Sequence, residues 1–459
     1  MQSKIHIFEN SWIIRLLAKT EIWFAIVLAI APIASTMVCA AVAGMAIFSL
    51  FVRKVIFGTN PSVTQHLPSV SVGRHLPLAG EARRGAPTLT WFVLAFLILT
   101  FIYSLTSLDI IGSLKIWSIY ALFISMFFIA REVIKTKKDW SLACWVLASV
   151  GGLVASYGVF QNFFGTNLGH AWLDEEMFTG ISVRVYSTLG NPNVLGEYLL
   201  LTIPVTVGLL WNKITNYKLQ ITNVGRFATQ IIFLLGLVGM QLLCMIYTQS
   251  RGCWVALAFS ALIFILFVDK RWMLLLIVGL IAAPFILPQS MMDRLLSIGN
   301  MGDSSTSYRV NIWMGTLNML EHFWLTGVGL GAAAFAKVYP FYSYSMITAP
   351  HAHNIYLQTL SEMGVVGLAL LVLIISSFVF GVVRFYVKQT PPPLRGTSPS
   401  QGRHLRASPQ VVMAVAFMAG MLGFMLQGAF DYVWYNYRVF LMFWLFLGIG
   451  SKIAEQQKE

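Results

Sequence analysis

Long apolar blocks separated by short polar segments dominate the pattern along this chain. A helix needs roughly 20 predominantly apolar residues to cross a membrane, and a somewhat shorter run can tilt or extend into its flanks. On this basis we predict transmembrane helices in the runs 91–107, 111–130, 140–161, 195–211, 229–247, 253–268, 272–287, 364–386, 411–430 and 436–450.

The apolar region 11–52 fits either one long helix or two short helices broken near Pro32, where proline removes a helix hydrogen bond. The basic residues decide between them. Loops rich in Lys and Arg alternate with poor ones, and the rich ones satisfy the positive-inside rule if they face the cytoplasm. The N-terminal stretch carries Lys4, Arg15 and Lys19, so it belongs on that side too. We therefore predict two helices in 11–52, twelve in all, and two cytoplasmic termini.

The composition supports this interpretation and excludes other classes of protein. Hydrophobic residues make up 57% of the chain and charged residues only 11%, whereas soluble domains average about 25% charged residues. A net charge of +13 would suggest nucleic acid in a soluble protein. Here most basic residues lie in predicted cytoplasmic segments, so we expect the lipid bilayer as a partner and no nucleic acid.

The predicted organisation has three parts within one all-α, polytopic membrane protein. Residues 1–287 hold helices 1–9 and a loop at 162–194 on the side opposite the cytoplasm, residues 288–363 form a large loop on that same side, and residues 364–459 hold helices 10–12. A loop as long as 288–363 is seldom structureless, and helical spacing of apolar residues after Ser304 predicts a helix inside it. The segments 60–90 and 389–410, rich in Pro, Gly, Ser and Arg, are interpreted as solvated linkers.

Three arginines outside the cytoplasmic loops are the first candidates for chemistry. Arg251 lies in a short turn between two spans, where arginine is costly unless it is paired, anchors at the interface or is functional. Arg309 lies near the start of the predicted loop helix, where a cation opposes the helix dipole and a bound anion would offset this. Arg184 fits either an anion contact or an ordinary loop charge.

Two histidines close together form the second candidate group, in Pro350-His351-Ala352-His353-Asn354. A His-x-His pair can bind a metal, but no third ligand follows at helical spacing, so we predict no metal site. His353 could be structural or could act as a general base. With the arginines, whose forked donors match diphosphate oxygens, it suggests chemistry on an anionic substrate at the membrane surface.

Residues 180–385 resemble the O-antigen ligase-like (Wzy-C) family of bacterial membrane proteins. His353-Asn354, followed after nine residues by Gly364 and then Gly367, is similar to that family's His-Asn-x9-Gly-x2-Gly motif. Other segments resemble the family in the same order: Gly190-Asn191-Pro192-Asn193, Ser250-Arg251-Gly252, Arg309 before Asn311-Ile312-Trp313, and Gly327-Val328-Gly329-Leu330-Gly331.

The resemblance implies a GT-C-like fold and an inverting glycosyltransferase that needs no metal or other cofactor. Such ligases transfer a glycan from undecaprenyl diphosphate to a lipid A–core sugar hydroxyl, on the periplasmic face of the bacterial inner membrane. By carry-over, His353 would activate the acceptor hydroxyl. Arg251 and Arg309 would bind the diphosphate, with Arg184 as a helper.

Three other functions stay open from the sequence. An O-antigen polymerase would use the same donor with a second lipid-linked glycan as acceptor, and a related ligase could use another acceptor, such as a protein hydroxyl. A small-anion transporter belongs to a different class. Transporters place charges near the middle of their spans, whereas the predicted spans here are nearly free of charge.

Overall fold

The computed structural model describes residues 19–54, 87–165, 184–215, 224–286, 289–297, 299–300, 302–389 and 407–456. Within these ranges every regular element is a helix. Nine of the helices in the described part of the chain are long and apolar enough to cross a membrane, which makes the chain a polytopic membrane protein. They are α5 (Pro87–Leu105), α6 (Ile110–Val133), α7 (Lys137–Phe164), α8 (Pro192–Thr215), α9 (Val224–Tyr247), α10 (Arg251–Val268), α15 (Ile355–Gln389), α16 (Pro409–Gln427) and α17 (Tyr437–Glu455).

Three further apolar helices are shorter than a full span. The predicted break near Pro32 is confirmed, because α3 (Thr20–Ile30) and α4 (Thr36–Val52) flank it. With α11 (Met273–Ile286) these helices occupy the remaining predicted positions. They contain 11, 17 and 14 residues, fewer than the roughly 20 that span a bilayer. The predicted total of twelve is therefore not confirmed, and the GT-C-like fold stays a prediction.

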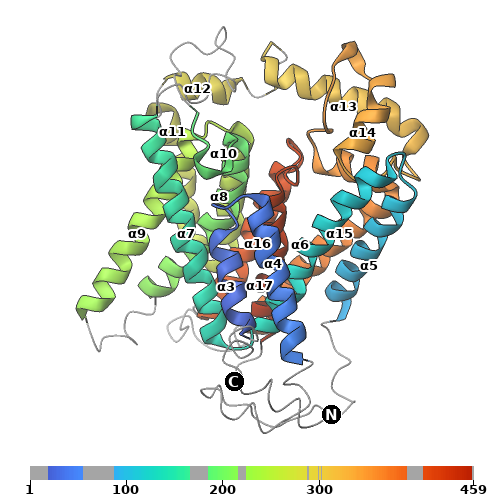
Figure 1. Ribbon diagram of the computed structural model, residues 1–459. Helices are drawn as coiled ribbons and strands as arrows, with labels where there is room; N and C mark the ends of the chain where they lie inside the picture. Colours follow the sequence, from blue (N-terminus) through green and yellow to red (C-terminus); the bar gives the residue numbers. More distant parts are fainter. Residues whose placement is uncertain are drawn as a thin grey trace, which may run out of the picture.

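With the shorter α3, α4 and α11 included, successive helices of the bundle run in opposite directions (Figure 1). The helices of the predicted large loop, α12 (Gln289–Leu296), α13 (Ser304–Phe323) and α14 (Ala332–Val338), gather at one end, which we call the outer end. At the opposite, inner end Arg131 of α6 pairs with Glu455 of α17 at 2.8 Å. Pro32, in the turn after α3, accepts a hydrogen bond from Thr188 at the outer end. Since α3 therefore starts at the inner end, the described chain begins and ends on the same side of the bundle. Which side faces the cytoplasm stays a prediction.

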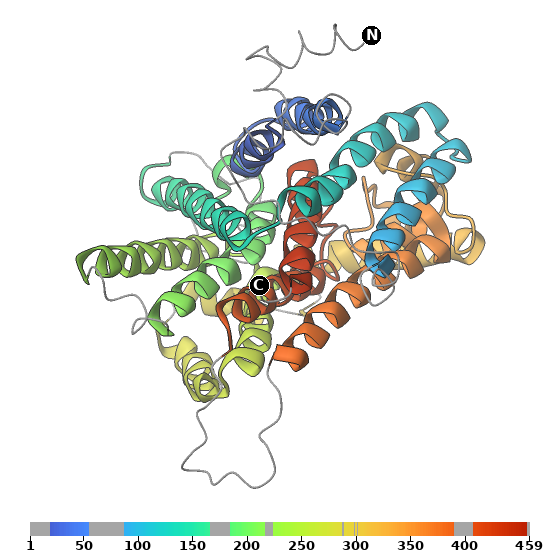
Figure 2. The same cartoon turned by 90° about the horizontal axis from the view of Figure 1, so that it is seen from below.

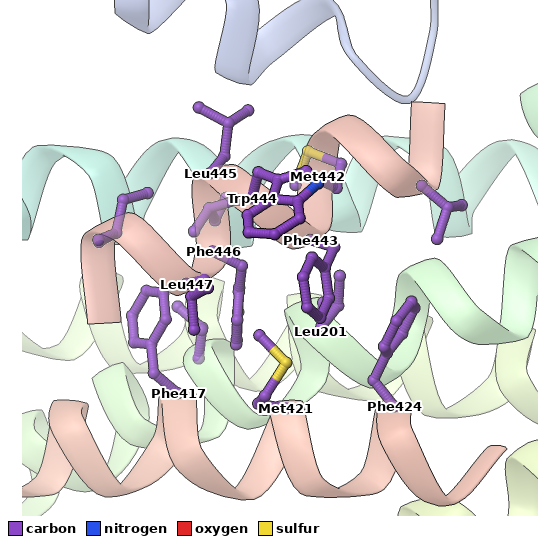
Figure 3. Close-up of a cluster of buried hydrophobic side chains, with 14 of the residues drawn as sticks. Leu201, Phe417, Met421, Phe424, Met442, Phe443, Trp444, Leu445, Phe446 and Leu447 are labelled. Carbon is purple, nitrogen blue, oxygen red and sulfur yellow. The ribbon is translucent and has the colours of Figure 1, made fainter. Parts of the chain in front are cut away.

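The most buried helices are α8, α16 and α17, and α16 and α17 lie at the centre of the bundle in Figure 2. Figure 3 shows Phe417 and Phe424 of α16 facing Phe443 and Phe446 of α17. Gly423 permits close helix contact, since a Cβ there would lie 2.9 Å from the Ala256 carbonyl oxygen. Such small residues let membrane helices approach. This packed centre carries the α16–α17 turn to the outer end.

Several predictions concern residues outside the described ranges. The segments 60–90 and 389–410 lie largely outside them, as does the middle of the predicted periplasmic loop 162–194.

Candidate functional site

A histidine and a carboxylate form the polar centre of the outer end. His353 Nδ1 lies 3.0 Å from Oδ1 of Asp431, in the turn between α16 and α17. Burial alone would raise the pKa of Asp431, but the hydrogen bond from His353 and the charge of Arg309 hold it well below its ordinary value. An ionised carboxylate only accepts hydrogen bonds, so Nδ1 donates and Nε2 of the neutral ring is left to accept a proton. This is the geometry of an oriented general base.

Asn354 explains why His353 meets Asp431. Its Oδ1 accepts hydrogen bonds from two backbone N–H groups in the first turn of α15, at 2.9 and 3.0 Å, as a helix N-cap does. Its Nδ2 donates to the Ala429 carbonyl oxygen at 2.8 Å. One side chain therefore starts the helix after His353 and holds the turn that carries Asp431.

The backbone of His353 is held in an unusual conformation. Its φ of 46° lies in the left-handed region, which side chains other than glycine seldom adopt and which clusters at functional sites. The carbonyl oxygen of His353 accepts a hydrogen bond from Trp313 Nε1 at 3.3 Å. The backbone N–H of His353 donates to His351 Nδ1 at 3.2 Å. Burial is the main cause that lowers the pKa of His351 to about 3, so that ring stays neutral and acts as an acceptor.

Four arginines line a pocket beside this histidine: Arg184, Arg251, Arg294 and Arg309. Burial, followed by the charges of the other three, lowers the pKa of Arg184 to about 9. A pKa of about 9 keeps Arg184 charged at neutral pH, and the neighbouring guanidinium groups repel it. A pocket with such concentrated positive charge favours an anion, above all one with several oxygens.

Arg309 has the most direct access to a ligand. It projects from the second turn of α13, with NH1 2.6 Å from Ser305 Oγ and NH2 3.6 Å from Asp431 Oδ2. Its buried Nε has no hydrogen-bond partner within the described part of the chain. A buried donor without a partner is costly. With 22% of its side chain exposed, Arg309 is nevertheless more open to the pocket than Arg251 at 10%.

Arg251 is more constrained than the sequence suggested. As the first residue of α10, it directs its guanidinium to the side chains of Ser297 and Asp303. Asp303 in turn caps α13, accepting from the Thr306 N–H at 3.0 Å. Arg251 therefore contributes charge to the pocket and also fixes α10 to the helix that carries Arg309.

Arg184 reaches Asp431 through Asn193, near the start of α8. Arg184 NH2 donates to Asn193 Oδ1 at 3.0 Å, and Asn193 Nδ2 donates to Asp431 Oδ2 at 3.1 Å. Arg184 Nε also donates to the Thr248 carbonyl oxygen at 3.0 Å. The two oxygens of Asp431 thus serve different partners: Oδ1 holds His353, and Oδ2 faces Asn193 and Arg309.

The structure gathers every residue singled out in the sequence. Arg184, Arg251 and Arg309 share one pocket, and His353 joins it through Asp431. Sequence reasoning did not single out Asp431 or Arg294. Asp431 carried a usable signal, because it is an acid in a short turn between the last two predicted spans, and unpaired charges at a membrane edge need a reason.

The glycine run 327–331 has a packing role. Gly329 has a φ of 112°, and a Cβ there would lie 2.0 Å from Ser107 Oγ. The backbone N–H groups of Val328 and Gly329 donate to the carbonyl oxygens of Ser361 and Glu362, at 2.8 and 3.2 Å. The run therefore packs the loop against α15 through backbone hydrogen bonds.

No group of three or more His, Cys, Asp or Glu side chains able to hold a metal ion occurs among the described residues. His351 and His353 are adjacent, with ring centroids 4.1 Å apart, but their ring nitrogens bond to His353 N–H and to Asp431. Independence from metal stays a prediction.

Comparison with known proteins agrees with the resemblance seen in the sequence. Residues 233–372 match a family model described as O-Antigen ligase. The matched segment contains Arg251, Arg309 and His353, whereas Arg184 and Asp431 lie outside it. No curated protein matches the chain.

Proposed function

Given the O-antigen ligase domain at residues 233–372, we propose that this protein transfers a glycan from undecaprenyl diphosphate to a sugar hydroxyl of lipid A–core. The reaction takes place at the outer end of the bundle, on the periplasmic face of the bacterial inner membrane. It is a direct displacement with inversion at the anomeric carbon and uses no metal or other cofactor.

The observation that carries the proposal is the double role of Asp431. Its Oδ1 accepts from His353 at 3.0 Å, and its Oδ2 lies 3.6 Å from Arg309. A base and an anion pocket are therefore joined by one carboxylate. Glycosyl transfer from a lipid diphosphate needs both, because a hydroxyl must lose a proton while a diphosphate departs.

The proposed step begins with the acceptor hydroxyl at His353 Nε2. The ring takes the hydroxyl proton as the oxygen attacks the anomeric carbon, and the imidazolium that forms is stabilised by Asp431. The bond from that carbon to the diphosphate oxygen breaks, and the electron pair leaves with the diphosphate. A new glycosidic bond and a free lipid diphosphate result.

The arginine pocket supplies the second half of the chemistry. Negative charge on the diphosphate grows as the bond breaks, and preorganised cations act where charge develops. We assign Arg309 to the diphosphate oxygens, with Arg184, Arg251 and Arg294 around them. Arg184 and Arg251 bind less directly, because Thr248 and Asn193 occupy part of the first guanidinium, and Ser297 and Asp303 part of the second.

Reconstitution tests the proposal and its alternatives together. Purified protein in liposomes receives undecaprenyl-diphosphate glycan with either lipid A–core or a second lipid-linked glycan. We expect the glycan to appear on lipid A–core. Transfer to the lipid-linked glycan instead identifies a polymerase, and anion flux without transfer identifies a transporter.

His353→Ala tests the catalytic assignment in the same assay. We expect transfer to fall to background while the protein still inserts and folds, because the hydroxyl has lost its base. His322→Ala, at an exposed position on α13, is the matched control and should keep full activity. Undiminished transfer by His353→Ala would refute the role of His353.

A further inference from the structure

A second and larger cavity lies on the other side of the α16–α17 turn. Its volume is about 650 Å³, within the roughly 300–1,000 Å³ of ordinary ligand sites. Aromatic residues dominate one wall: Tyr120, Tyr432, Trp434, Tyr435 and Tyr437. Hydroxyl and amide groups of Ser35, Thr36 and Asn436 line other parts of it. The mechanism above uses none of these residues.

One side chain, that of His351, separates this cavity from His353. The ring of His351 packs between the two, with its centroid 4.1 Å from that of His353 and 4.5 Å from that of Tyr435. Tyr432 lines the cavity and directly follows Asp431 in the chain. The arginine pocket is instead reached through Oδ2 of Asp431. The His353–Asp431 pair thus stands between the positively charged arginine pocket and an aromatic cavity.

We propose that the aromatic cavity binds the acceptor sugar, an inference that rests on the proposed function. In a direct displacement the nucleophile attacks from the face opposite the leaving group. If the diphosphate occupies the arginine pocket, the acceptor hydroxyl approaches from the other side of the base, where the cavity lies.

The lining of the cavity suits a sugar ring, because its charged residue, Arg438, already donates to the carbonyl oxygens of Thr188 and Leu189. The aliphatic face of a pyranose packs on an aromatic ring, while its hydroxyls need donors and acceptors around the rim. Tyr435 offers such a face, since 54% of its surface is exposed. The Tyr432 hydroxyl is fixed by the Tyr120 hydroxyl at 2.9 Å. Tyr435 is therefore the stacking residue, and Tyr432 forms a rigid floor.

Tyr435→Ala tests this assignment in two measurements. In steady-state transfer with lipid A–core, we expect the acceptor KM to rise roughly tenfold or more, the usual effect of losing an aromatic anchor, with the donor KM unchanged. Tyr435→Phe keeps the ring and should stay near wild type. Tyr344→Ala, an exposed tyrosine of the outer end that does not line the cavity, should change neither KM.

Binding without turnover separates this inference from the proposed reaction. Lipid A–core and undecaprenyl-diphosphate glycan are titrated separately onto His353→Ala and onto His353→Ala combined with Tyr435→Ala. Loss of lipid A–core binding alone in the double variant supports the inference, even if wild type transfers nothing. Loss of donor binding alone assigns the cavity to the donor glycan, and unchanged binding of both shows that it holds no sugar. Either result overturns the inference.

Discussion

Asp431 is a buried carboxylate whose two oxygens face different groups. Its position orients the imidazole of His353, and the same charge offsets part of the repulsion among the arginines. Removing the charge while keeping the shape therefore separates its orienting role from its role in packing.

We expect Asp431→Asn to lower kcat by roughly 10²- to 10⁴-fold, as seen when an orienting aspartate is neutralised in a catalytic triad. An asparagine amide can donate to Nδ1, and Nε2 would then carry the proton and could not accept another. The donor KM should change little, because Arg309 and Arg184 remain. Kinetics with both substrates measures the split, and a rise in donor KM at unchanged kcat would contradict the orienting role.

Arg309→Lys should weaken donor binding by roughly ten- to a hundredfold, the usual worth of a hydrogen bond to a charged group. A lysine keeps the charge but cannot contact two phosphate oxygens as a planar fork does. Titration with undecaprenyl-diphosphate glycan measures the affinity. Arg384→Lys, at an exposed position of α15, provides the control, and equal affinity for both variants would count against a diphosphate contact.

At this scale the sequence identified charges but could not identify their partners. His353, Arg251 and Arg309 lie in motifs that can be recognised locally. Asp431 lies 78 residues from His353, and no local pattern links the two positions. The pairing of Arg251 with Asp303 could not be predicted either, because Asp303 caps a different helix.

The break in α15 at Gly364 is where the outer loop attaches to this helix. Gly364 has a φ of 61°, and a Cβ there would lie 2.1 Å from the Leu325 carbonyl oxygen. Just before the break, the carbonyl oxygens of Ser361 and Glu362 accept hydrogen bonds from Val328 and Gly329. The loop therefore satisfies backbone groups that the interrupted helix leaves without partners.

Gly364→Ala should destabilise the protein by more than about 2 kcal/mol, since a left-handed residue and a backbone clash both oppose the new Cβ. Gly381→Ala, in the same helix, meets no atom within 4 Å and should be neutral or slightly stabilising. Thermal unfolding in detergent, followed by the fraction that stays monodisperse, compares the two. Equal melting temperatures of the two variants would show that the helix break tolerates a side chain at position 364.

The helices themselves were largely predictable, because apolar runs in a membrane must form helices to satisfy their backbone groups. Predicted runs such as 253–268 and 436–450 differ from α10 and α17 by only a few residues. The arrangement of the helices in the outer loop was harder to predict from the sequence. The helix expected after Ser304 is confirmed as α13. Its N-cap is Asp303, which also accepts a hydrogen bond from Arg251 of α10.

For the whole molecule, the alternation of helix directions places all the chemistry at one end. The inner end carries Lys138 at the start of α7, and the outer end carries Phe341, which is 85% exposed. The four cysteines are buried, so they should not compete for a surface label.

We expect Phe341→Cys to react with a membrane-impermeant maleimide in cells whose outer membrane is permeabilised. Lys138→Cys should react only after the inner membrane is also opened, because basic residues remain on the cytoplasmic side. Gel shift of the labelled protein measures both variants. The reverse pattern would place the candidate site in the cytoplasm and remove the basis for a periplasmic donor.

The buried arginines also govern how the reaction ends. Under the proposed reaction, the donor diphosphate carries two negative charges while it is esterified at both ends, and the released lipid diphosphate carries up to one more. The pocket that favours departure of this group therefore holds the spent carrier lipid more tightly than the fresh donor. Release of that lipid would then limit turnover, and the spent carrier would act as a competitive inhibitor of the donor. A phosphatase that trims the released diphosphate would keep such a transferase running forward.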